Sequence, residues 1–389
     1  MRDLLLGREP KDFDVATDAS PEQVREVFRN CRLIGRRFRL AHVHFGQEII
    51  EVATFRAGQD AEDAEQHQND EGRLLRDNVY GTIEQDALRR DFSVNALYYN
   101  VADFSIIDYT GGVEDLQNGV LRLLGDPETR YREDPVRMLR AMRFAAKLGF
   151  RIAPETEQPI GELGPLLADI PPARLFEEVL KLFLGGTAVG GFEKLRQYGL
   201  FAQLFPDTEG CLARLDHEFP LTLVLKGLEN TDTRVREDKP VTPAFLFAVL
   251  LWEPVRQRAE ALQADGTAPH QAIQQAAAEV LSRQLDRVAL PRRFSTPMQE
   301  IWSLQPRFGH TRGKRPQRLL AHPRFRAAYD FMLLRASAGE ADPELATWWT
   351  DLQQGNAEAP PPTSNAEKRR RPRRRRRAKR SAEASTETQ

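Results

Sequence analysis

Cysteine is nearly absent from this 389-residue sequence, in which only Cys31 and Cys211 occur. Two cysteines exclude a disulfide framework and a cysteine-rich zinc site, and a reducing cytoplasm is the expected compartment. No apolar run approaches the roughly 18 residues that a membrane-spanning helix needs, so no membrane span is expected. The segment 1–7 is too short and too charged for a signal peptide.

Acidic residues are missing from the run 368–380, where 11 of 13 residues are Lys or Arg. Without this run the chain has 45 basic and 57 acidic groups, so an acidic body carries a basic tail. Because like charges repel, we predict a disordered arm whose ligand is a polyanion such as a nucleic acid. The alternative is a solvated tail with no partner. The prolines at 360–362 predict a linker before it.

The remaining pattern divides the chain into a mixed first part and a helical second part. Up to about residue 124, short β-rich runs alternate with one or two helices, and the pattern is helical from Asp134 onward. Ser20 with Gln23 forms a capping box that predicts a helix start, and strands are expected on both sides of Gly46. The sequence therefore predicts the α+β class, with a small mixed-sheet head and a helical remainder.

Asp12 and Asp14 form a pair of carboxylates that strand alternation would place on one face. Carboxylates at this spacing can hold divalent metal ions against a phosphate, although a solvated strand end has the same pattern. A third carboxylate would strengthen the prediction, and the candidates are Glu51 and Asp91. For Glu51 the alternative is a partner for a nearby arginine, because a carboxylate among apolar strand residues needs one.

A second group of residues lies on a helix that Asp134 and Pro135 are expected to start. At 100° per residue, one stripe of this helix is cationic. Its members are Arg137, Arg140, Arg143 and Lys147. Guanidinium groups suit phosphates and the edges of bases; the alternatives are a solvated cationic face and, for Asp134, simple capping. The third group, Arg36, Arg37 and Arg39 around Phe38, could contact RNA or be an ordinary basic loop.

Together these segments resemble the class II nucleotidyltransferases, which comprise CCA-adding enzymes and bacterial poly(A) polymerases. The resemblance is carried in order by residues 2–7, 12–14, 89–92 and 133–137. Residues 33–43, residues 170–178 and the basic tail are similar to the poly(A) polymerase branch. The family resemblance implies four parts of the chain. They are a palm-like nucleotidyltransferase head at 1–124, a helical neck at 125–198, a helical RNA-binding body at 199–352 and a tail at 353–389.

The resemblance also implies the reaction, in which an RNA 3′-hydroxyl attacks the α-phosphate of ATP and pyrophosphate leaves. Two Mg²⁺ ions would be held by Asp12 and Asp14, with Asp91 as the third acidic catalytic residue. The nucleotide would be bound by Arg2, Arg90, Asp134, Arg137, Arg140 and Arg143. Asp134 and Arg137 would read the edge of the base.

RNA 3′ ends are the implied partner, with RNA-processing proteins as possible partners of the tail. The predicted RNA contacts are Arg36, Arg37, Arg39, Arg315, Arg373, Arg374 and Arg375. Arg315 belongs to residues 301–329, which contain no Asp or Glu.

The family has a Gly-Gly turn before the position of Arg2, and this sequence starts after it. A start assigned too late, or a truncated protein with an open sheet edge, would explain the difference.

From the resemblance as a whole we predict a template-independent RNA adenylyltransferase. The alternatives are a CCA-adding enzyme and a non-catalytic RNA-binding protein.

Overall fold

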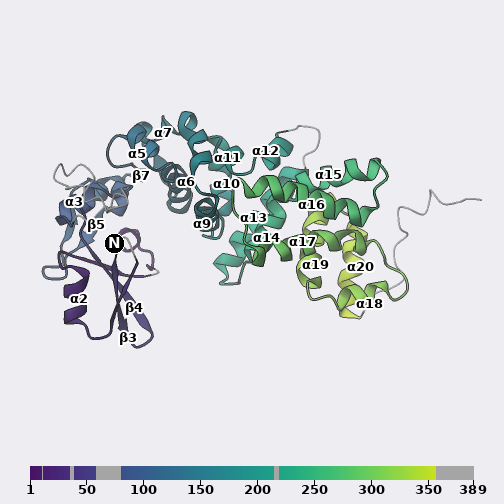
Figure 1. Cartoon of the computed structure of the whole chain (residues 1–389), viewed down its shortest axis with the longest axis horizontal. Coiled ribbons are helices and arrows are strands. Elements are labelled where there is room, and N and C mark those ends of the chain that lie inside the picture. The colour runs from purple at the N-terminus through teal and green to yellow at the C-terminus, as the bar shows by residue number, and fades with distance from the viewer. Residues whose placement is uncertain (11, 36–38, 58–79, 214–218, 356–389) are drawn as a thin grey trace, which may run out of the picture.

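The computed structural model describes residues 1–10, 12–35, 39–57, 80–213 and 219–355. They form an elongated molecule, in which a head with a small sheet lies at one end and helices extend away from it (Figure 1). The predicted α+β class is confirmed. None of the helices in this part of the chain is long and apolar enough to cross a membrane.

The head contains most of the strands and several short helices. They are α1 (Arg2–Leu5), β1 (Asp14–Thr17), α2 (Pro21–Val27), β2 (Cys31–Ile34), β3 (Leu40–Phe45), β4 (Glu48–Thr54), α3 (Ile83–Leu88), the 3₁₀ helix η1 (Ser93–Asn95), β5 (Leu97–Tyr99), β6 (Ile106–Asp108), α4 (Gly112–Gln117) and β7 (Val120–Leu121). The predicted start of α2 is confirmed, because Ser20 and Gln23 form both hydrogen bonds of a capping box.

The main sheet has the strand order β1-β4-β3-β2. β1 is parallel to β4 and the other pairs are antiparallel, so the sheet is mixed, as predicted. Its β3–β4 turn contains Gly46 at φ +64°, a conformation that favours glycine. On one face Ala41, Val43 and Val52 pack with Val24 of α2. The strand residues that alternate with Ala41, Val43 and Val52 point to the opposite face of the sheet.

The neck and body are built from helices. Those of the neck are α5 (Pro127–Glu133), α6 (Val136–Leu148), α7 (Pro154–Glu157), α8 (Ile160–Leu163), the 3₁₀ helix η2 (Gly164–Asp169), α9 (Pro172–Phe183) and α10 (Ala188–Gln197). Those of the body are α11 (Leu200–Leu204), α12 (Pro206–Leu212), α13 (Phe219–Arg236), α14 (Pro243–Leu250), α15 (Trp252–Ala264), α16 (Pro269–Leu285), α17 (Arg292–Phe308), α18 (Arg315–Leu320), α19 (Phe325–Ser337) and α20 (Pro343–Gln354).

Two details of the neck differ from the prediction. The helix expected to start at Asp134 and Pro135 is α6, but a further helix, α5, precedes it, because Asp126 accepts a hydrogen bond from the Thr129 amide and caps a helix that begins at Pro127. The two-residue strand β8 (Arg151–Ile152) interrupts the helices and pairs with β7. Gly149 ends α6 at φ +76° and turns the chain back toward β7, a step that a helical period cannot reveal.

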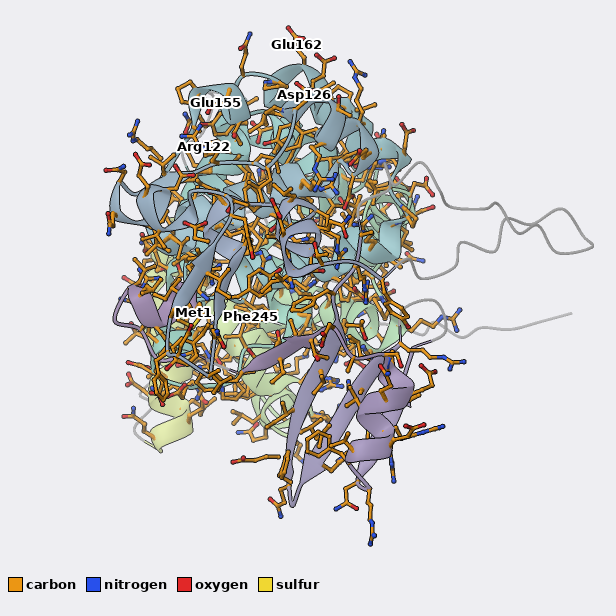
Figure 2. All side chains as sticks on the ribbon, turned by 90° about the vertical axis from the view of Figure 1, so that its left-hand side faces the viewer. Met1, Arg122, Asp126, Glu155, Glu162 and Phe245 are labelled. Carbon is orange, nitrogen blue, oxygen red and sulfur yellow. The ribbon has the colours of Figure 1, made fainter. Side chains whose placement is uncertain are left out.

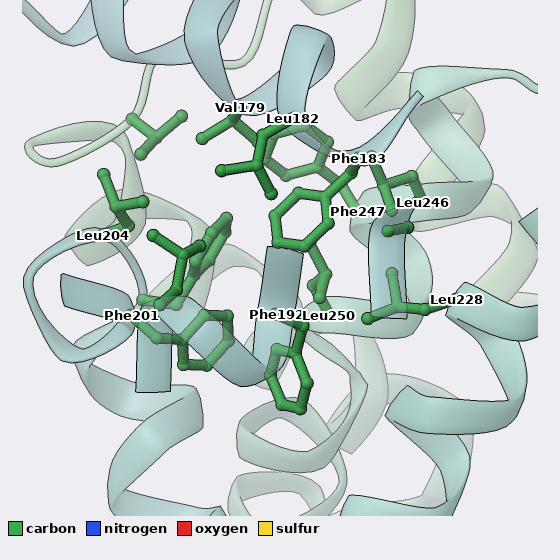
Figure 3. Close-up of a cluster of buried hydrophobic side chains, with 14 of the residues drawn as sticks. Val179, Leu182, Phe183, Phe192, Phe201, Leu204, Leu228, Leu246, Phe247 and Leu250 are labelled. Atoms are coloured by element: carbon green, nitrogen blue, oxygen red, sulfur yellow. The ribbon is translucent and has the colours of Figure 1, made fainter. Parts of the chain in front are cut away.

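One hydrophobic core runs from Phe92 in the head to Ala338 in the body. Figure 3 shows its centre, where side chains of the neck helices meet those of α13 and α14. Phe192 and Phe201 meet edge to face at 4.9 Å between ring centroids. Burying each such side chain contributes about 1.5–3 kcal/mol. The shared core holds the neck and the body together. The predicted domain boundaries stay predictions.

Candidate active site

The acidic pair lies at the start of β1, the edge strand of the sheet. β1 begins at Asp14, so Asp12 precedes the strand instead of forming part of it. Asp14 is in register with Glu51 of β4, Glu51 with His42 of β3, and His42 with Arg32 of β2. These four residues form one polar row across the sheet, on the face opposite α2.

The carboxylates of Asp12 and Asp14 are exposed. Neither makes an ion pair or a hydrogen bond with the residues that the structure describes. Glu51 lies 3.3 Å from His42, measured from Oε1 to Nε2, so its partner is a histidine rather than the expected arginine. In the described ranges no three His, Cys, Asp or Glu residues are grouped closely enough to hold a metal ion. As far as the described residues go, the oxygens of Asp12 and Asp14 are therefore available to other ligands.

Asp91 is buried beside the neck helix α6. It accepts hydrogen bonds from the Phe92 amide at 2.8 Å and from Asn95 Nδ2 at 3.2 Å. Its Oδ2 lies 2.6 Å from Arg140 Nη2 in an ion pair whose geometry is not that of a hydrogen bond. Of the two candidates for a third carboxylate, the register thus places Glu51 next to Asp14, whereas Asp91 holds a cation of α6.

The predicted cationic stripe of α6 is present, and α1 adds to it. Arg140 reaches Asp91, and the Arg143 guanidinium carbon lies 4.5 Å from the centre of the Phe144 ring. Arg2 of α1 approaches the same ring at 4.9 Å and donates a hydrogen bond to Asn95 Oδ1. Burial lowers the pKa of Arg143, and its Nε is buried without a hydrogen-bond partner. The structure therefore gathers three of the predicted nucleotide-binding arginines in one place.

Arg90 is held by Asp86, which the sequence analysis missed. The buried Asp86 carboxylate accepts hydrogen bonds from Arg90 Nη2 at 2.8 Å, Arg89 Nε at 2.9 Å and the Tyr98 hydroxyl at 2.6 Å. Burial alone would raise the pKa of Asp86, but the Tyr98 hydrogen bond and the charges of Arg90 and Arg89 lower it. Burial and the Asp86 hydrogen bond raise the pKa of Tyr98 to about 12. The i, i+3 and i, i+4 spacing to two arginines was the available signal.

Asp134 is both a cap and an ion-pair partner. Its Oδ1 accepts a hydrogen bond from the Val136 amide at 3.3 Å, and its Oδ2 accepts one from Arg174 Nη2 at 2.7 Å. Arg174 belongs to α9 and was not predicted as a site residue. Arg137 donates to Glu133 and to the Arg130 carbonyl oxygen at 2.9 and 2.6 Å. Asp134 and Arg137, the two residues expected to read the base, are thus already hydrogen-bonded to other residues of the protein.

The junction behind Asp91 is fixed by a second buried carboxylate, Asp115. It accepts a hydrogen bond from the Ser93 hydroxyl at 2.6 Å and pairs with Arg122. Arg122 also pairs with Glu155 of α7, and Figure 2 shows these two labelled side chains together. Head and neck are therefore joined by charge as well as by the hydrophobic core.

The predicted RNA contacts fall in three places. Arg39 lies at the start of the β3 segment and pairs with Glu22 at 2.7 Å. Arg36 and Arg37, like Arg373, Arg374 and Arg375 of the tail, lie outside the described residues. Arg315 begins α18 and is exposed. Arg315 makes no ion pair with any residue that the structure describes, and the same is true of its neighbours Arg312, Lys314 and Arg318.

Comparison with known proteins identifies the family. The "Poly A polymerase head domain" matches residues 1–122, "Probable RNA and SrmB- binding site of polymerase A" matches residues 149–212, and "Polymerase A arginine-rich C-terminus" matches residues 265–381. Poly(A) polymerase I of Salmonella typhi is 52% identical over 93% of this chain and 78% of its own length. This chain belongs to the bacterial poly(A) polymerase family. The predicted family and enzyme class, a nucleotidyltransferase, are thereby confirmed.

The alternative prediction, a CCA-adding enzyme, corresponds to more distant relatives. A CC-adding tRNA nucleotidyltransferase of Halalkalibacterium halodurans is 39% identical, but over 52% of this chain and 47% of its own length. A crystal structure of a tRNA nucleotidyltransferase with a primer tRNA and an ATP analog has a TM-score of 0.61 at 20% identity, covering 91% of this polymerase and 93% of that chain. The likeness shows a shared fold. The poly(A) polymerase assignment is thus favoured over the CCA-adding one.

Proposed function

We propose that this polymerase adds AMP from ATP to RNA 3′-hydroxyl ends without a template and releases pyrophosphate. The observation that carries the proposal is that two elements present complementary chemistry. The start of β1 offers free carboxylates, and α6 with α1 offers a cluster of arginines. Nucleotidyl transfer needs both, because the reacting oxygens and the departing triphosphate carry negative charge. Family membership supports adenylyl transfer as the reaction.

Asp12 and Asp14 are suited to Mg²⁺. This ion is usually bound through one or two carboxylates together with substrate phosphates, and neither aspartate has another partner among the described residues. We propose that they hold two ions, with Glu51, which is in register with Asp14, as the candidate for a third carboxylate. When bound, the ions would lower the pKa of the attacking hydroxyl and neutralise charge on the phosphates.

The arginines have separate roles in the proposal. Arg2, Arg140 and Arg143 would contact the triphosphate, for which guanidinium groups supply charge and paired donors. Asp91 would keep its proposed catalytic role by orienting Arg140 in that cluster. Arg90, fixed by Asp86, would contact the triphosphate or the ribose.

Base recognition would fall to Asp134 and Arg137. Adenine presents an amino donor and ring-nitrogen acceptors, which match a carboxylate and a guanidinium. For this contact each residue must exchange its present partner, Arg174 or Glu133, for the base.

RNA would be guided by the exposed cations around α18. Arg312, Lys314, Arg315 and Arg318 can neutralise phosphates without losing ion pairs of their own. The basic tail and residues 149–212, which match the probable RNA- and SrmB-binding site, are the proposed surfaces for RNA-processing protein partners. The cytoplasm is the proposed compartment.

The test is a primer-extension assay with Mg²⁺, labelled RNA and single nucleotides. A long ladder with ATP alone is the expected result, whereas addition that stops after C, C and A on truncated tRNA would contradict the proposal. Asp12→Ala should abolish extension and leave RNA affinity nearly unchanged. Asp169→Ala is the matched control, since this exposed aspartate has no ion pair or hydrogen bond among the described residues. Retained extension in Asp12→Ala would remove Asp12 from the mechanism.

A further inference from the structure

The head has a concave surface at the β2 edge of its sheet, which is the edge opposite β1. A cavity of about 340 Å³ is lined by Arg29, Asn30, Cys31, Arg32 and His44. It lies where β2 begins and β3 approaches its end, so it is separate from the arginine cluster on α6. None of these residues has a role in the reaction proposed above.

Two arginines line the cavity, and the described part of the chain provides no ion-pair partner for either. Arg29 and Arg32 are exposed, and neither makes an ion pair with a residue that the structure describes. No carboxylate lines the cavity. The His44 amide donates a hydrogen bond to the Asn30 carbonyl oxygen at 2.9 Å, which joins the two sides. Two free guanidinium groups on a fixed backbone suit a phosphate-bearing ligand.

Two exposed aromatic residues are next in sequence to residues that line the cavity. Phe28 directly precedes Arg29 and Phe45 directly follows His44. Their ring centroids are 6.3 Å apart at an interplanar angle of 75°, and the residues are 39% and 52% exposed. Free cations beside exposed rings are the combination with which proteins hold single-stranded nucleic acid, because phosphates pair with the cations and bases stack on the rings. A protein partner would not require the unpaired guanidinium groups.

The sheet register relates this surface to the acidic pair. Arg32 and Asp14 are at opposite ends of the polar row, three strand spacings apart, or about 14 Å at the usual 4.7–4.9 Å per spacing. A stacked strand rises about 3.4 Å per nucleotide. An RNA whose 3′ end reaches Asp14 would therefore pass Arg32 about four nucleotides upstream.

We propose that Phe28, Arg29, Arg32, His44 and Phe45 form an upstream RNA site, which holds a phosphate and a base of the primer a few nucleotides before its 3′ end. This rests on the proposed adenylyl transfer, since the primer end defines the distance. It predicts a dependence on primer length that a general basic surface does not produce.

The experiment compares the full chain with the variant Arg29→Gln/Arg32→Gln. The primers are the dodecamer A12, which spans the site, and the dinucleotide ApA, which does not. We expect the KM for A12 and its Kd by fluorescence anisotropy to rise roughly tenfold, with kcat and the KM for ATP unchanged. The slope of log affinity against log salt should fall by about 0.7, because the contact with one phosphate is lost. The KM for ApA should not change.

Two further variants complete the test. Arg25→Gln/Arg151→Gln removes the same charge from exposed positions outside the cavity and should leave the KM for A12 near that of the wild type. Phe45→Ala removes an exposed ring and should raise the KM for A12 without affecting ApA.

The outcomes separate this inference from the proposed function. An equal loss in the Arg25/Arg151 control, or an equal loss with ApA, would overturn the upstream site. Unchanged A12 binding would also overturn it and would leave the surface for a protein partner. If the wild type bound A12 but added no AMP, the proposed reaction would fail, whereas a weakened A12 complex in the variant would still support the site.

Discussion

Asp86→Asn is the change that most directly tests how Arg90, one of the proposed nucleotide-binding arginines, is held. Asp86 has a 3% exposed side chain and is paired with Arg89 and Arg90, whose side chains are 33% and 39% exposed. An asparagine keeps the size but removes the charge, and its amide nitrogen would face two cations. Removing one partner of a buried ion pair typically costs 3–5 kcal/mol. Because both arginines are partly hydrated, we expect a loss of unfolding free energy near the lower end, about 3 kcal/mol.

The assay is thermal unfolding together with steady-state kinetics. For a cooperative unit of 150–250 residues, 1 kcal/mol corresponds to roughly 2–4 °C, so the Tm of the transition that includes the head should fall by about 6–12 °C. The KM for ATP should rise, because Arg90 loses its fixed position. Asp169→Asn removes one charge from an exposed position and should change stability by less than about 0.5 kcal/mol. A loss in Asp86→Asn as small as that of the control would refute the role of this carboxylate.

The pH dependence provides a second check on Asp86. Its pKa is lowered in the folded state by Tyr98 and the two arginines, against the effect of burial. The unfolded chain then binds the proton more tightly. The stabilisation is fully present above the unfolded pKa of about 3.9 and is lost as the pH falls through the lower folded pKa. The difference between wild type and Asp86→Asn should stay constant from about pH 5 to 8 and shrink below about pH 4; a constant difference in acid would contradict the assignment.

Two further predictions concern the base and the RNA. Arg174→Ala frees the Asp134 carboxylate from its present partner; because this pair is partly exposed, its worth is at most about 1 kcal/mol. The ATP-to-CTP preference in kcat/KM should therefore change by no more than about fivefold, and no change would show that Arg174 does not position Asp134. Arg315→Gln/Arg318→Gln should raise the KM for long RNA and reduce the salt slope by about 1.4. An unchanged salt slope, measured by RNA titration from 50 to 200 mM salt, would exclude phosphate contacts at α18.

The parts of the fold that could be predicted depend on local signals. The capping box of Ser20 and Gln23, the turn at Gly46 and the cationic stripe of α6 each lie within a few residues of sequence. Asp86 could not be assigned in this way, because its environment includes Tyr98, 12 residues away. The pair of Asp134 and Arg174 spans 40 residues. From the residues alone both Glu51 and Asp91 were candidates for the third carboxylate, and the resemblance favoured Asp91. The register of β1 with β4 is what places Glu51 beside Asp14.

Contacts around Phe144 attach helix α1 to helix α6. Asp3 pairs with Lys147 and Arg8 donates to the Lys147 carbonyl oxygen, so the start of the chain is attached along the neck helix. This attachment brings Arg2 to the ring that Arg143 also contacts. Burial lowers the pKa of Arg143, and the charges of Arg140 and Arg2 lower it further, whereas the carboxylates of Glu178 and Asp91 raise it. Folding has thus gathered three arginines at one site, with Asp3 beside Arg2 and Asp91 beside Arg140. In the proposed function a bound triphosphate would add negative charge to this site and so reduce the repulsion among the arginines.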